Sequence, residues 1–311
     1  MVRWKRKDLL TLEELSKEEI EFILETAKSF KEVSTRDVKK VPTLRGKTIV
    51  NLFFEPSTRT RTSFELAAKR LSADVLDFSI GGSSVSKGES AVDTARNIEA
   101  MKVDCFIVRH SVAGVPKLIA QEVKAAVINA GDDSHEHPTQ GLLDLFTIRE
   151  KKGKIKGLKI SIVGDIQHSR VARSNIWGLT KLGASVILCG PPTLIPLGIK
   201  NLGVEVTYSL KEAIKKADIL YFLRVQRERQ KETFFPSTQE YALLYGMDLE
   251  SLKQSKKDLL IMHPGPINRG IEIKSEVAES TSSLILEQVT NGIAVRMAVL
   301  YLTCGKKEIK N

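Results

Sequence analysis

The chain has 311 residues, of which 42% are hydrophobic and 28% are charged, close to the average for globular proteins. This composition excludes a disordered chain, a collagen-like repeat and a small disulfide-stabilised protein, and the length suits two domains of about 150 residues each. Near the end, the longest apolar run, residues 292–302, contains Arg296 and is far shorter than the roughly 20 residues of a membrane span. No apolar stretch of signal-peptide length follows the basic amino end. We therefore expect a soluble, cytoplasmic protein that makes no contact with membranes.

Lysine and arginine outnumber aspartate and glutamate by 48 to 38, which gives a net charge of +10. Such an excess is compatible with nucleic-acid binding, and equally with an enzyme whose electric field attracts anionic substrates. The basic residues are not concentrated in one tail and only 6% of residues are aromatic, which favours the enzyme. Three cysteines without CxxC spacing indicate neither disulfide bonds nor a structural zinc site, and we expect them to act as small apolar residues: Cys105, Cys189 and Cys304.

The apolar pattern of the first half predicts helices that alternate with buried strands. Ser16 and Glu19 have the spacing of a capping box, and the apolar residues after them repeat with helical period within the first 40 residues. Pro138 suits the first turn of another helix, whose buried residues would be Leu142, Leu145 and Phe146. The other predicted elements of this half are strands at 47–54, 106–109 and 125–129 and a helix at 61–71.

A lysine-rich stretch at residues 151–159 predicts a solvated connection to a second series of strands and helices. Its predicted strands are 159–164, 184–189, 218–223 and 259–262, with a helix from about residue 170. The last segment, 282–302, has an apolar stripe of helical period, formed by Leu284, Ile285, Val289, Ile293 and Met297.

Strands that alternate with helices predict an α/β fold with parallel sheets and right-handed crossovers. We expect two doubly wound domains with an active-site cleft between them. The first would comprise residues 1–150, with a helix at 282–311 packing back on it, and the second residues 151–281.

In parallel sheets, ligands bind beyond the carboxyl ends of the strands. After the first predicted strand, positions 57 to 62 hold four hydroxyl residues and two arginines. Amide groups at a helix start attract anions, and an arginine offers a planar fork for phosphate. A helix cap would need only one such residue, so a phosphate site is favoured, formed by Ser57, Thr58, Arg59 and Thr60. It is not a Walker A loop, because the GxxxxGK[ST] pattern is absent.

Other strand ends are also polar. Arg109 and His110 follow one strand, and His135-Glu-His-Pro-Thr-Gln140 follows the next. An H-x-H pair can ligate zinc, but the chain has only five histidines, and polarisation of a substrate carbonyl by one histidine is favoured over a metal. His263-Pro-Gly-Pro266 has the composition of a rigid turn that aims carbonyls into a cleft, or of a simple connection.

In the second half, Arg170 and Arg224 lie at strand ends, where they would suit substrate carboxylates or face solvent. The segment 164–170 lacks the GxGxxG pattern, so a nicotinamide cofactor is not supported.

Together these segments resemble the transcarbamylase family over nearly the whole chain. Ser57-Thr-Arg-Thr-Arg61 is similar to its carbamoyl phosphate signature and His137-Pro-Thr-Gln140 to its second motif. Members that use ornithine are expected to have an Asp-x-x-x-Ser-Met segment and a His-Cys-Leu-Pro turn, and this chain has neither. Phe222-Leu-Arg-Val-Gln226 and His263-Pro-Gly-Pro266 resemble the members that use aspartate. Gly265 replaces a leucine of some relatives, but only backbone carbonyls are used there.

The resemblance implies that carbamoyl phosphate and L-aspartate react to give N-carbamoyl-L-aspartate and phosphate, an early step of pyrimidine biosynthesis, without metal or cofactor. The implied catalytic residues are Arg59, Thr60, Arg109 and His137. The implied ligands of carbamoyl phosphate are Ser57, Thr58, Arg59, Thr60, Arg109, His137, Gln140, Pro264, Gly265 and Pro266. The implied ligands of aspartate are Lys87, Arg170, Arg224 and Gln226. No residue is an evident general base, and the leaving phosphate is a candidate acceptor for the amine proton.

The resemblance also implies an oligomer. Residues 81–89 form a glycine- and serine-rich loop, in which Ser83 and Lys87 would reach the site of a neighbouring subunit, so a homotrimer is the minimum. Regulatory chains, or another enzyme of the pathway such as dihydroorotase, are further partners that the sequence leaves open. The alternatives are carbamoyl transfer to another amine and a basic α/β protein that binds nucleic acid.

Overall fold

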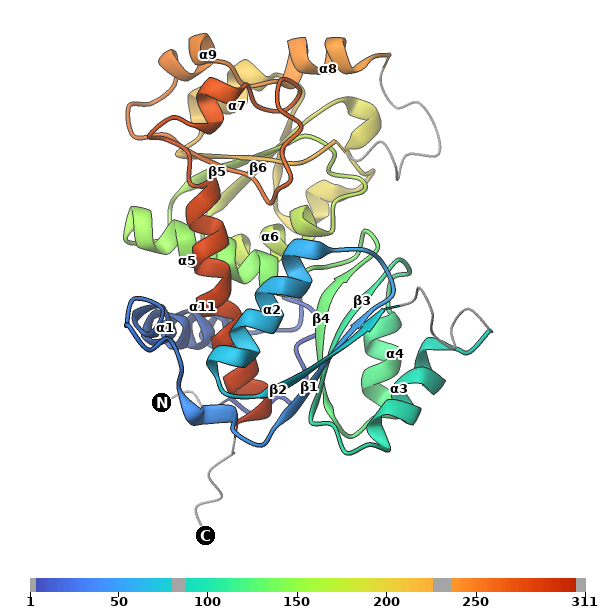
Figure 1. The fold of residues 1–311 in the computed structure, drawn as a ribbon. Coiled ribbons are helices and arrows are strands. Elements are labelled where there is room, and N and C mark those ends of the chain that lie inside the picture. Colours follow the sequence, from blue (N-terminus) through green and yellow to red (C-terminus); the bar gives the residue numbers. More distant parts are fainter. Residues whose placement is uncertain (1–3, 80–87, 226–235, 306–311) are drawn as a thin grey trace. The chain divides into compact units, whose positions relative to one another are not determined.

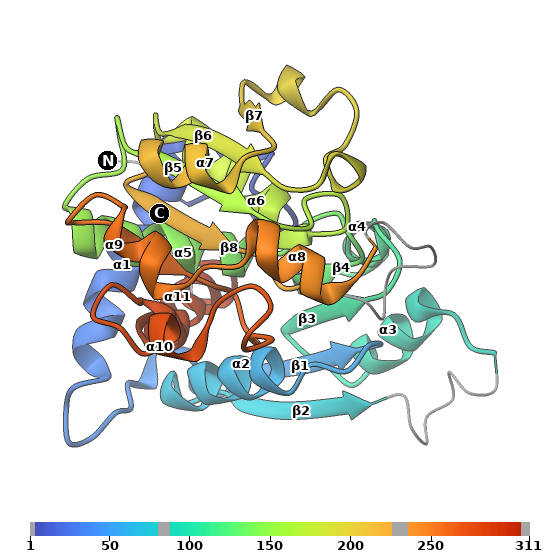
Figure 2. The same cartoon turned by 90° about the horizontal axis from the view of Figure 1, so that it is seen from above.

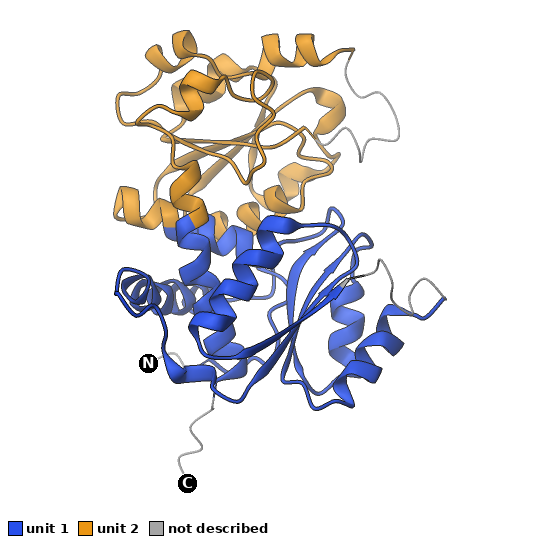
Figure 3. Cartoon of the chain, viewed as in Figure 1, with its two compact units in different colours: residues 1–146, 290–311 blue, residues 147–289 orange. Residues whose placement is uncertain are grey.

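A computed structural model describes residues 4–79, 88–225 and 236–305, and the chain divides into two compact units (Figure 3). Unit 1 comprises Met1–Phe146 and Thr290–Asn311, and unit 2 comprises Thr147–Val289. Both divisions fall inside helices, α5 (Pro138–Lys152) and α11 (Ile285–Cys304). The predicted boundaries at 150/151 and 281/282 therefore differ from the structure by four and by eight residues. Part of the lysine-rich stretch is the last turn of α5, where positive charge is favourable.

Unit 1 contains a parallel sheet of four strands in the order β2-β1-β3-β4 (Figure 1). Its strands are β1 (Thr48–Phe53), β2 (Asp74–Ser79), β3 (Cys105–His110) and β4 (Ala126–Asp132). Its other helices are α1 (Lys17–Val33), α2 (Thr58–Arg70), α3 (Ala91–Glu99) and α4 (Val115–Glu122), with a 3₁₀ turn at Pro42–Leu44. The capping box is confirmed: the Ser16 hydroxyl accepts from Glu19 N, and the Glu19 carboxylate accepts from Ser16 N.

The two faces of the unit 1 sheet pack against different helices (Figure 1). Val50 and Leu52 of β1 join Ala95 of α3 and Ile119 of α4 in one apolar cluster. Because side chains alternate along a strand, the neighbouring β1 residues face the other side, where α2 contacts the strand and buries Phe64. This arrangement confirms the expected α/β layers.

The final helix differs from the predicted stripe. Val289 is 57% exposed, whereas every residue from Ala294 to Leu300 is buried, including Arg296. A helix buried nearly all round has no single apolar stripe for periodicity to identify. In the part of the chain that the structure describes, no helix is long and apolar enough to cross a membrane.

Unit 2 contains a parallel sheet of five strands in the order β7-β6-β5-β8-β9. Its strands are β5 (Lys159–Val163), β6 (Ser185–Cys189), β7 (Glu205–Thr207), β8 (Ile219–Phe222) and β9 (Leu260–Met262). Its other helices are α6 (Arg170–Lys181), α7 (Leu210–Lys216), α8 (Thr238–Tyr245), α9 (Leu249–Lys253) and α10 (Ser275–Ala278), with 3₁₀ turns at Pro192–Leu194 and Ile199–Leu202.

The sequence did not predict the edge strands β2 and β7. The apolar residues of β2 are interrupted by Asp77, and Leu76 is 48% exposed because this strand pairs on one side only (Figure 2). β7 has only three residues. Both strands lack the continuous apolar run that indicates a strand buried in the middle of a parallel sheet.

Each sheet has one point at which its winding reverses. In unit 1, β1 is flanked by β2 and β3, and in unit 2, β5 is flanked by β6 and β8. The chain therefore winds outward in both directions from β1 and from β5, as the predicted doubly wound fold requires. Ligands of such folds bind at these reversal points, beyond the carboxyl ends of the strands.

Candidate functional site

The reversal point of unit 1 lies between β1 and β3, and Arg109 at the end of β3 is fixed there by three contacts. Its backbone oxygen accepts from Phe54 N at 2.8 Å. Its guanidinium pairs with the Glu55 carboxylate at 2.6 Å and donates to the Ala130 carbonyl at 3.0 Å. Both charged side chains are mostly buried, with 12% and 13% of their surface exposed. The loop after β1 and the strand β4 therefore hold Arg109 in one orientation.

The amino end of α2 follows β1 at the same point. This helix begins at Thr58, three residues before the predicted start, so Thr58, Arg59 and Thr60 form its first turn. Ser57 occupies the N-cap position, but its hydroxyl makes no capping hydrogen bond, and the first turn contains no acidic residue. By contrast, Ser16 and Ser90 cap their own helices. Ser57 therefore does not cap α2 through its side chain, and the helix start retains its attraction for anions.

The loop between β4 and α5 is organised by buried carboxylates that the sequence did not single out. Asp132 accepts from Gly114 N at 2.8 Å and contacts His135 Nδ1 at 3.0 Å. Glu136, which is 1% exposed, accepts from Leu12 N and Glu13 N. His135 and Glu136 thus hold the loop itself together. Of the described residues, no three histidines, cysteines, aspartates or glutamates are grouped as metal ligands.

His137 lies at the start of α5 and is 5% exposed. Its carbonyl accepts from Gln140 N and Gly141 N, so the first turn of the helix fixes its backbone. Burial, together with the positive charges of Arg109 and Arg296, holds the pKa of His137 well below its usual range. The imidazole is therefore neutral at pH 7, and a neutral imidazole can donate one N–H to an oxygen.

The reversal point of unit 2 lies between β5 and β8. Leu223 N donates to Val163 O at 2.8 Å, which joins the ends of the two strands. After β5, Ser169 caps α6 through Ala172 N, and Arg170 is the first residue of that helix and 4% exposed. Arg224 follows β8 and is half-buried. Of the two arginines predicted at strand ends, Arg224 directly follows its strand, whereas Arg170 lies at the start of α6, seven residues after β5 ends.

The segment that contains Arg224 is held by Glu272, a residue that sequence reasoning missed. Glu272 is fully buried and accepts from Val225 N at 2.8 Å, from Asn268 N at 2.8 Å and from Asn268 Nδ2 at 2.7 Å. Burial raises the pKa of its carboxyl. No local pattern could have identified Glu272, because its partner Val225 is 47 positions away.

The turn at 263–266 begins at a residue that is held by hydrogen bonds. His263 is 1% exposed, its N donates to Gln288 Oε1 at 3.0 Å, and its Nδ1 accepts from Gly265 N at 2.8 Å. Gly265 has a φ of +64°, in the left-handed region that favours glycine. The Gly265–Pro266 peptide bond is cis. Ser83, Lys87 and Gln226, in contrast, lie outside the described residues.

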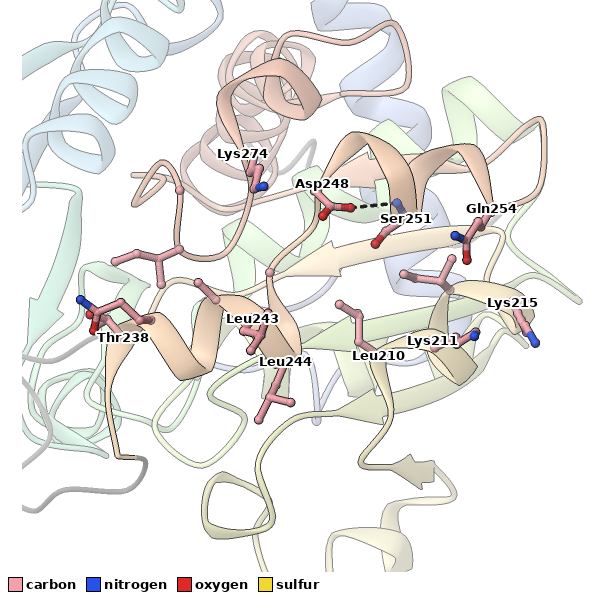
Figure 4. A pocket seen from close by; sticks show the side chains of 16 residues that line it. Leu210, Lys211, Lys215, Thr238, Leu243, Leu244, Asp248, Ser251, Gln254 and Lys274 are labelled. Carbon is pink, nitrogen blue, oxygen red and sulfur yellow. Dashed lines mark hydrogen bonds between the residues drawn. The ribbon is translucent and has the colours of Figure 1, made fainter.

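A pocket of about 590 Å³ in unit 2 lies elsewhere (Figure 4). It is bounded by residues of α7, α8 and α9 and by Gly270, Ile271 and Lys274. At its rim, Asp248 accepts from Ser251 N at 2.8 Å (Figure 4). None of the residues that line this pocket was predicted as a site residue.

Two family models together match most of the chain. The model of the aspartate/ornithine carbamoyltransferase carbamoyl-P binding domain matches residues 7–150, and that of the Asp/Orn binding domain matches residues 156–303. The chain therefore belongs to the aspartate/ornithine carbamoyltransferase family.

The names of similar sequences distinguish between the aspartate and ornithine branches of this family. The chain is 60% identical over 304 residues to the aspartate carbamoyltransferase catalytic subunit of Moorella thermoacetica, which covers 98% of this chain and 99% of the relative. It is 58% identical over 304 residues to the protein of the same name from Syntrophus aciditrophicus, again covering 98% and 99%.

Solved structures share the fold. Aspartate transcarbamoylase from Trypanosoma cruzi, in complex with N-(phosphonacetyl)-L-aspartic acid, has a TM-score of 0.89 at 28% identity, covering 97% of both chains. Ornithine carbamoyltransferase from Pyrococcus furiosus has a TM-score of 0.86 at 33% identity, covering 98% of this chain and 99% of that one.

Proposed function

We propose that this chain transfers the carbamoyl group of carbamoyl phosphate to the amine of L-aspartate, which yields N-carbamoyl-L-aspartate and phosphate. The observation that most strongly supports the first substrate is the start of α2, where Ser57 makes no capping hydrogen bond, at the strand end next to Arg109. This combination of amide groups, hydroxyls and fixed guanidinium suits the terminal phosphate group of an acyl phosphate. The product is an early intermediate of pyrimidine biosynthesis.

Residues of unit 1 hold the phosphate and polarise the carbamoyl group in this proposal. The phosphate is bound by Ser57, Thr58, Arg59, Thr60 and Arg109. The carbamoyl oxygen, on which negative charge grows, accepts hydrogen bonds from Thr60, Arg109 and neutral His137. One such donor typically contributes about 3 kcal/mol to stabilisation of the transition state. Because Glu55 and Ala130 already orient Arg109, little reorganisation is needed when charge develops.

Residues of unit 2 receive aspartate and the other end of the carbamoyl group. Arg170, Arg224 and Gln226 bind the two carboxylates of aspartate. The carbonyls of Pro264, Gly265 and Pro266, together with Gln140 of unit 1, accept from the carbamoyl NH₂. The amine attacks the carbamoyl carbon, the bond to the phosphate oxygen breaks, and the leaving phosphate takes the amine proton. Positioning of two anions then provides much of the rate.

Ornithine is the alternative acceptor, since a solved ornithine carbamoyltransferase has this fold at 33% identity. Two observations favour aspartate. The relatives at 58% and 60% identity are named aspartate carbamoyltransferase catalytic subunits. The chain also offers two arginines in unit 2, Arg170 at the start of α6 and Arg224 after β8, which suit a dicarboxylate better than a substrate with an ammonium side chain.

The assembly that we propose is a cytoplasmic homotrimer, in which Ser83 and Lys87 complete the site of a neighbouring subunit. These two residues lie outside the described part of the chain, and their role is inferred from the resemblance alone. The name catalytic subunit, used for the relatives, is compatible with additional chains such as regulatory subunits or dihydroorotase.

Release of phosphate from carbamoyl phosphate, measured with aspartate and with ornithine, tests the proposal. We expect turnover with aspartate and none above background with ornithine. Turnover with ornithine alone would assign the chain to the other branch of the family. A salt-dependent shift with DNA or RNA that carbamoyl phosphate does not diminish would instead support a nucleic-acid-binding protein.

A further inference from the structure

Gln140 is the one proposed carbamoyl ligand whose side chain could bind in two ways. A glutamine amide has an oxygen that accepts and an NH₂ group that donates. The carbamoyl NH₂ needs an acceptor, so only the orientation that presents the Gln140 oxygen is productive. The reverse orientation would place two NH₂ groups against each other. Something in the protein must therefore select between these two orientations.

The structure shows a neighbour able to make this selection. Asp144, one turn later in α5, is fully buried, and its Oδ1 accepts from Gln140 Nε2 at 3.0 Å. An ionised carboxylate is an acceptor only. The end of the Gln140 amide that faces Asp144 must therefore be the NH₂ group, and the oxygen is turned away from it.

The charge on Asp144 is itself supported by a buried arginine. Arg296 of α11 is 4% exposed, with its guanidinium 5.1 Å from the centre of the Phe64 ring of α2. Figures 1 and 2 both show α11 beside α2. Gly292, one turn before Arg296, leaves room for the guanidinium, since a Cβ there would lie 2.6 Å from Arg296 Nη1. Burial lowers the pKa of Arg296 to about 10, and attraction to Asp144 opposes this shift, so Arg296 stays positive at pH 7.

We propose that Asp144 is a positioning residue that fixes the Gln140 amide with its oxygen toward the carbamoyl NH₂. Asp144 does not touch the substrate, and the inference rests on the function proposed above. Loss of this positioning should weaken binding of the carbamoyl group and leave binding of the phosphate group unchanged.

The central variant is Asp144→Asn. Arg296 attracts the carbonyl oxygen of the new amide, which turns the asparagine NH₂ toward Gln140. Gln140 must then turn its own oxygen inward, away from the carbamoyl group. We expect the affinity for carbamoyl phosphate to fall about tenfold, equivalent to about 1.4 kcal/mol and to one hydrogen bond. The affinity for inorganic phosphate should stay within about twofold. Calorimetry with the full chain measures both.

Two other variants make the test decisive. Gln140→Ala removes the side chain that contacts the carbamoyl group. It therefore gives the ratio of the affinities for carbamoyl phosphate and inorganic phosphate that is expected when this contact is absent. The double variant with Asp144→Asn and Gln140→Glu exchanges acceptor and donor at unchanged net charge, so the asparagine NH₂ meets a carboxylate and an oxygen again faces the carbamoyl group. We expect this variant to recover most of the ratio. The double variant also allows the test to be made if Asp144→Asn alone fails to fold because a buried arginine has lost its countercharge.

A matched control is Asp104→Asn, which removes a carboxylate that binds Lys47 and Thr48 N at the amino ends of the strands of the same unit. If the effect is specific, Asp104→Asn leaves the ratio of the affinities for carbamoyl phosphate and inorganic phosphate unchanged. The proposal is overturned if Asp144→Asn leaves the ratio unchanged, lowers both affinities equally, or cannot be rescued by the double variant. A wild-type chain that does not bind carbamoyl phosphate would instead refute the proposed function, and an unchanged ratio in Gln140→Ala would refute the role of Gln140.

Discussion

The pH dependence of folding is expected to contain a contribution from His137. Its imidazole is buried beside two arginines, which holds its folded-state pKa well below 6.5, whereas the unfolded chain binds a proton near the usual pKa of about 6.5. Because the unfolded state binds more protons, acidification below this value favours unfolding. The stability that the neutral form provides is therefore present at pH 7 and lost as the pH falls.

We predict that His137→Gln unfolds with a shallower dependence on pH than the wild type. Below about pH 6.5 the difference should approach 1.4 kcal/mol of unfolding free energy per pH unit, since one proton is involved. Urea denaturation of both proteins between about pH 7 and about pH 5 measures it. Parallel curves for the two proteins would show that His137 titrates normally in the fold.

Arg224 provides a second prediction at the scale of single residues. Arg224→Ala should raise the aspartate concentration needed for turnover or abolish turnover, because a charge-assisted hydrogen bond to a carboxylate, worth about 1.5–3 kcal/mol, is lost. Carbamoyl phosphate binding should persist, because most of its proposed ligands belong to unit 1. Steady-state kinetics and calorimetry separate the two effects.

Arg269 supplies the control for this experiment. It is an arginine of the same unit, exposed and paired with Glu279 at 2.8 Å, so Arg269→Ala should leave both substrates unaffected. An equal loss of affinity for both substrates in Arg224→Ala would contradict the assignment of Arg224 to aspartate.

At the scale of secondary structure, the starts of α1 and α2 differ although both have a serine at the N-cap position. Ser16 makes the two hydrogen bonds of a capping box, and Ser57 makes no capping bond. Ser16→Ala should therefore cost about 0.5–2 kcal/mol of unfolding free energy, the usual range for a lost cap. Ser57→Ala should cost markedly less, and it should weaken phosphate binding, which Ser16→Ala should not. Denaturation curves and phosphate titrations of the two variants test this pair of expectations, and a larger stability loss at Ser57 would return it to a capping role.

At the scale of the whole molecule, the proposed trimer predicts complementation between inactive variants. If Lys87 of one chain completes the site that contains His137 of the next, Lys87→Ala and His137→Ala should each give nearly inactive trimers. In any mixed closed ring, one of the three sites then combines two unmutated contributions. Random mixing in equal amounts makes about three quarters of the trimers mixed, so about a quarter of wild-type activity should return. Activity that stays flat after demonstrated subunit exchange would show that each site belongs to a single chain.

The sequence by itself determined the alternation of strands and helices, the capped start of α1 and the motifs at the strand ends. These features depend on neighbours within three or four positions, such as Ser16 and Glu19 or the hydroxyl residues that follow β1. The turn at 263–266 belongs to the same group, because proline fixes φ and glycine permits a positive φ, and both are local effects.

Only the tertiary structure decided which strand ends are neighbours and what holds the side chains there. Strand order depends on crossovers between distant segments, so the reversal points at β1/β3 and β5/β8 cannot be read from periodicity. The partners of two predicted regions, Glu55 for Arg109 and Glu272 for the segment of Arg224, are carboxylates far away in the sequence, whereas Asp144 lies only four residues after Gln140 in the same helix. Each becomes a specific partner only where folding removes it from water, because a buried carboxylate must find hydrogen-bond donors or an opposite charge.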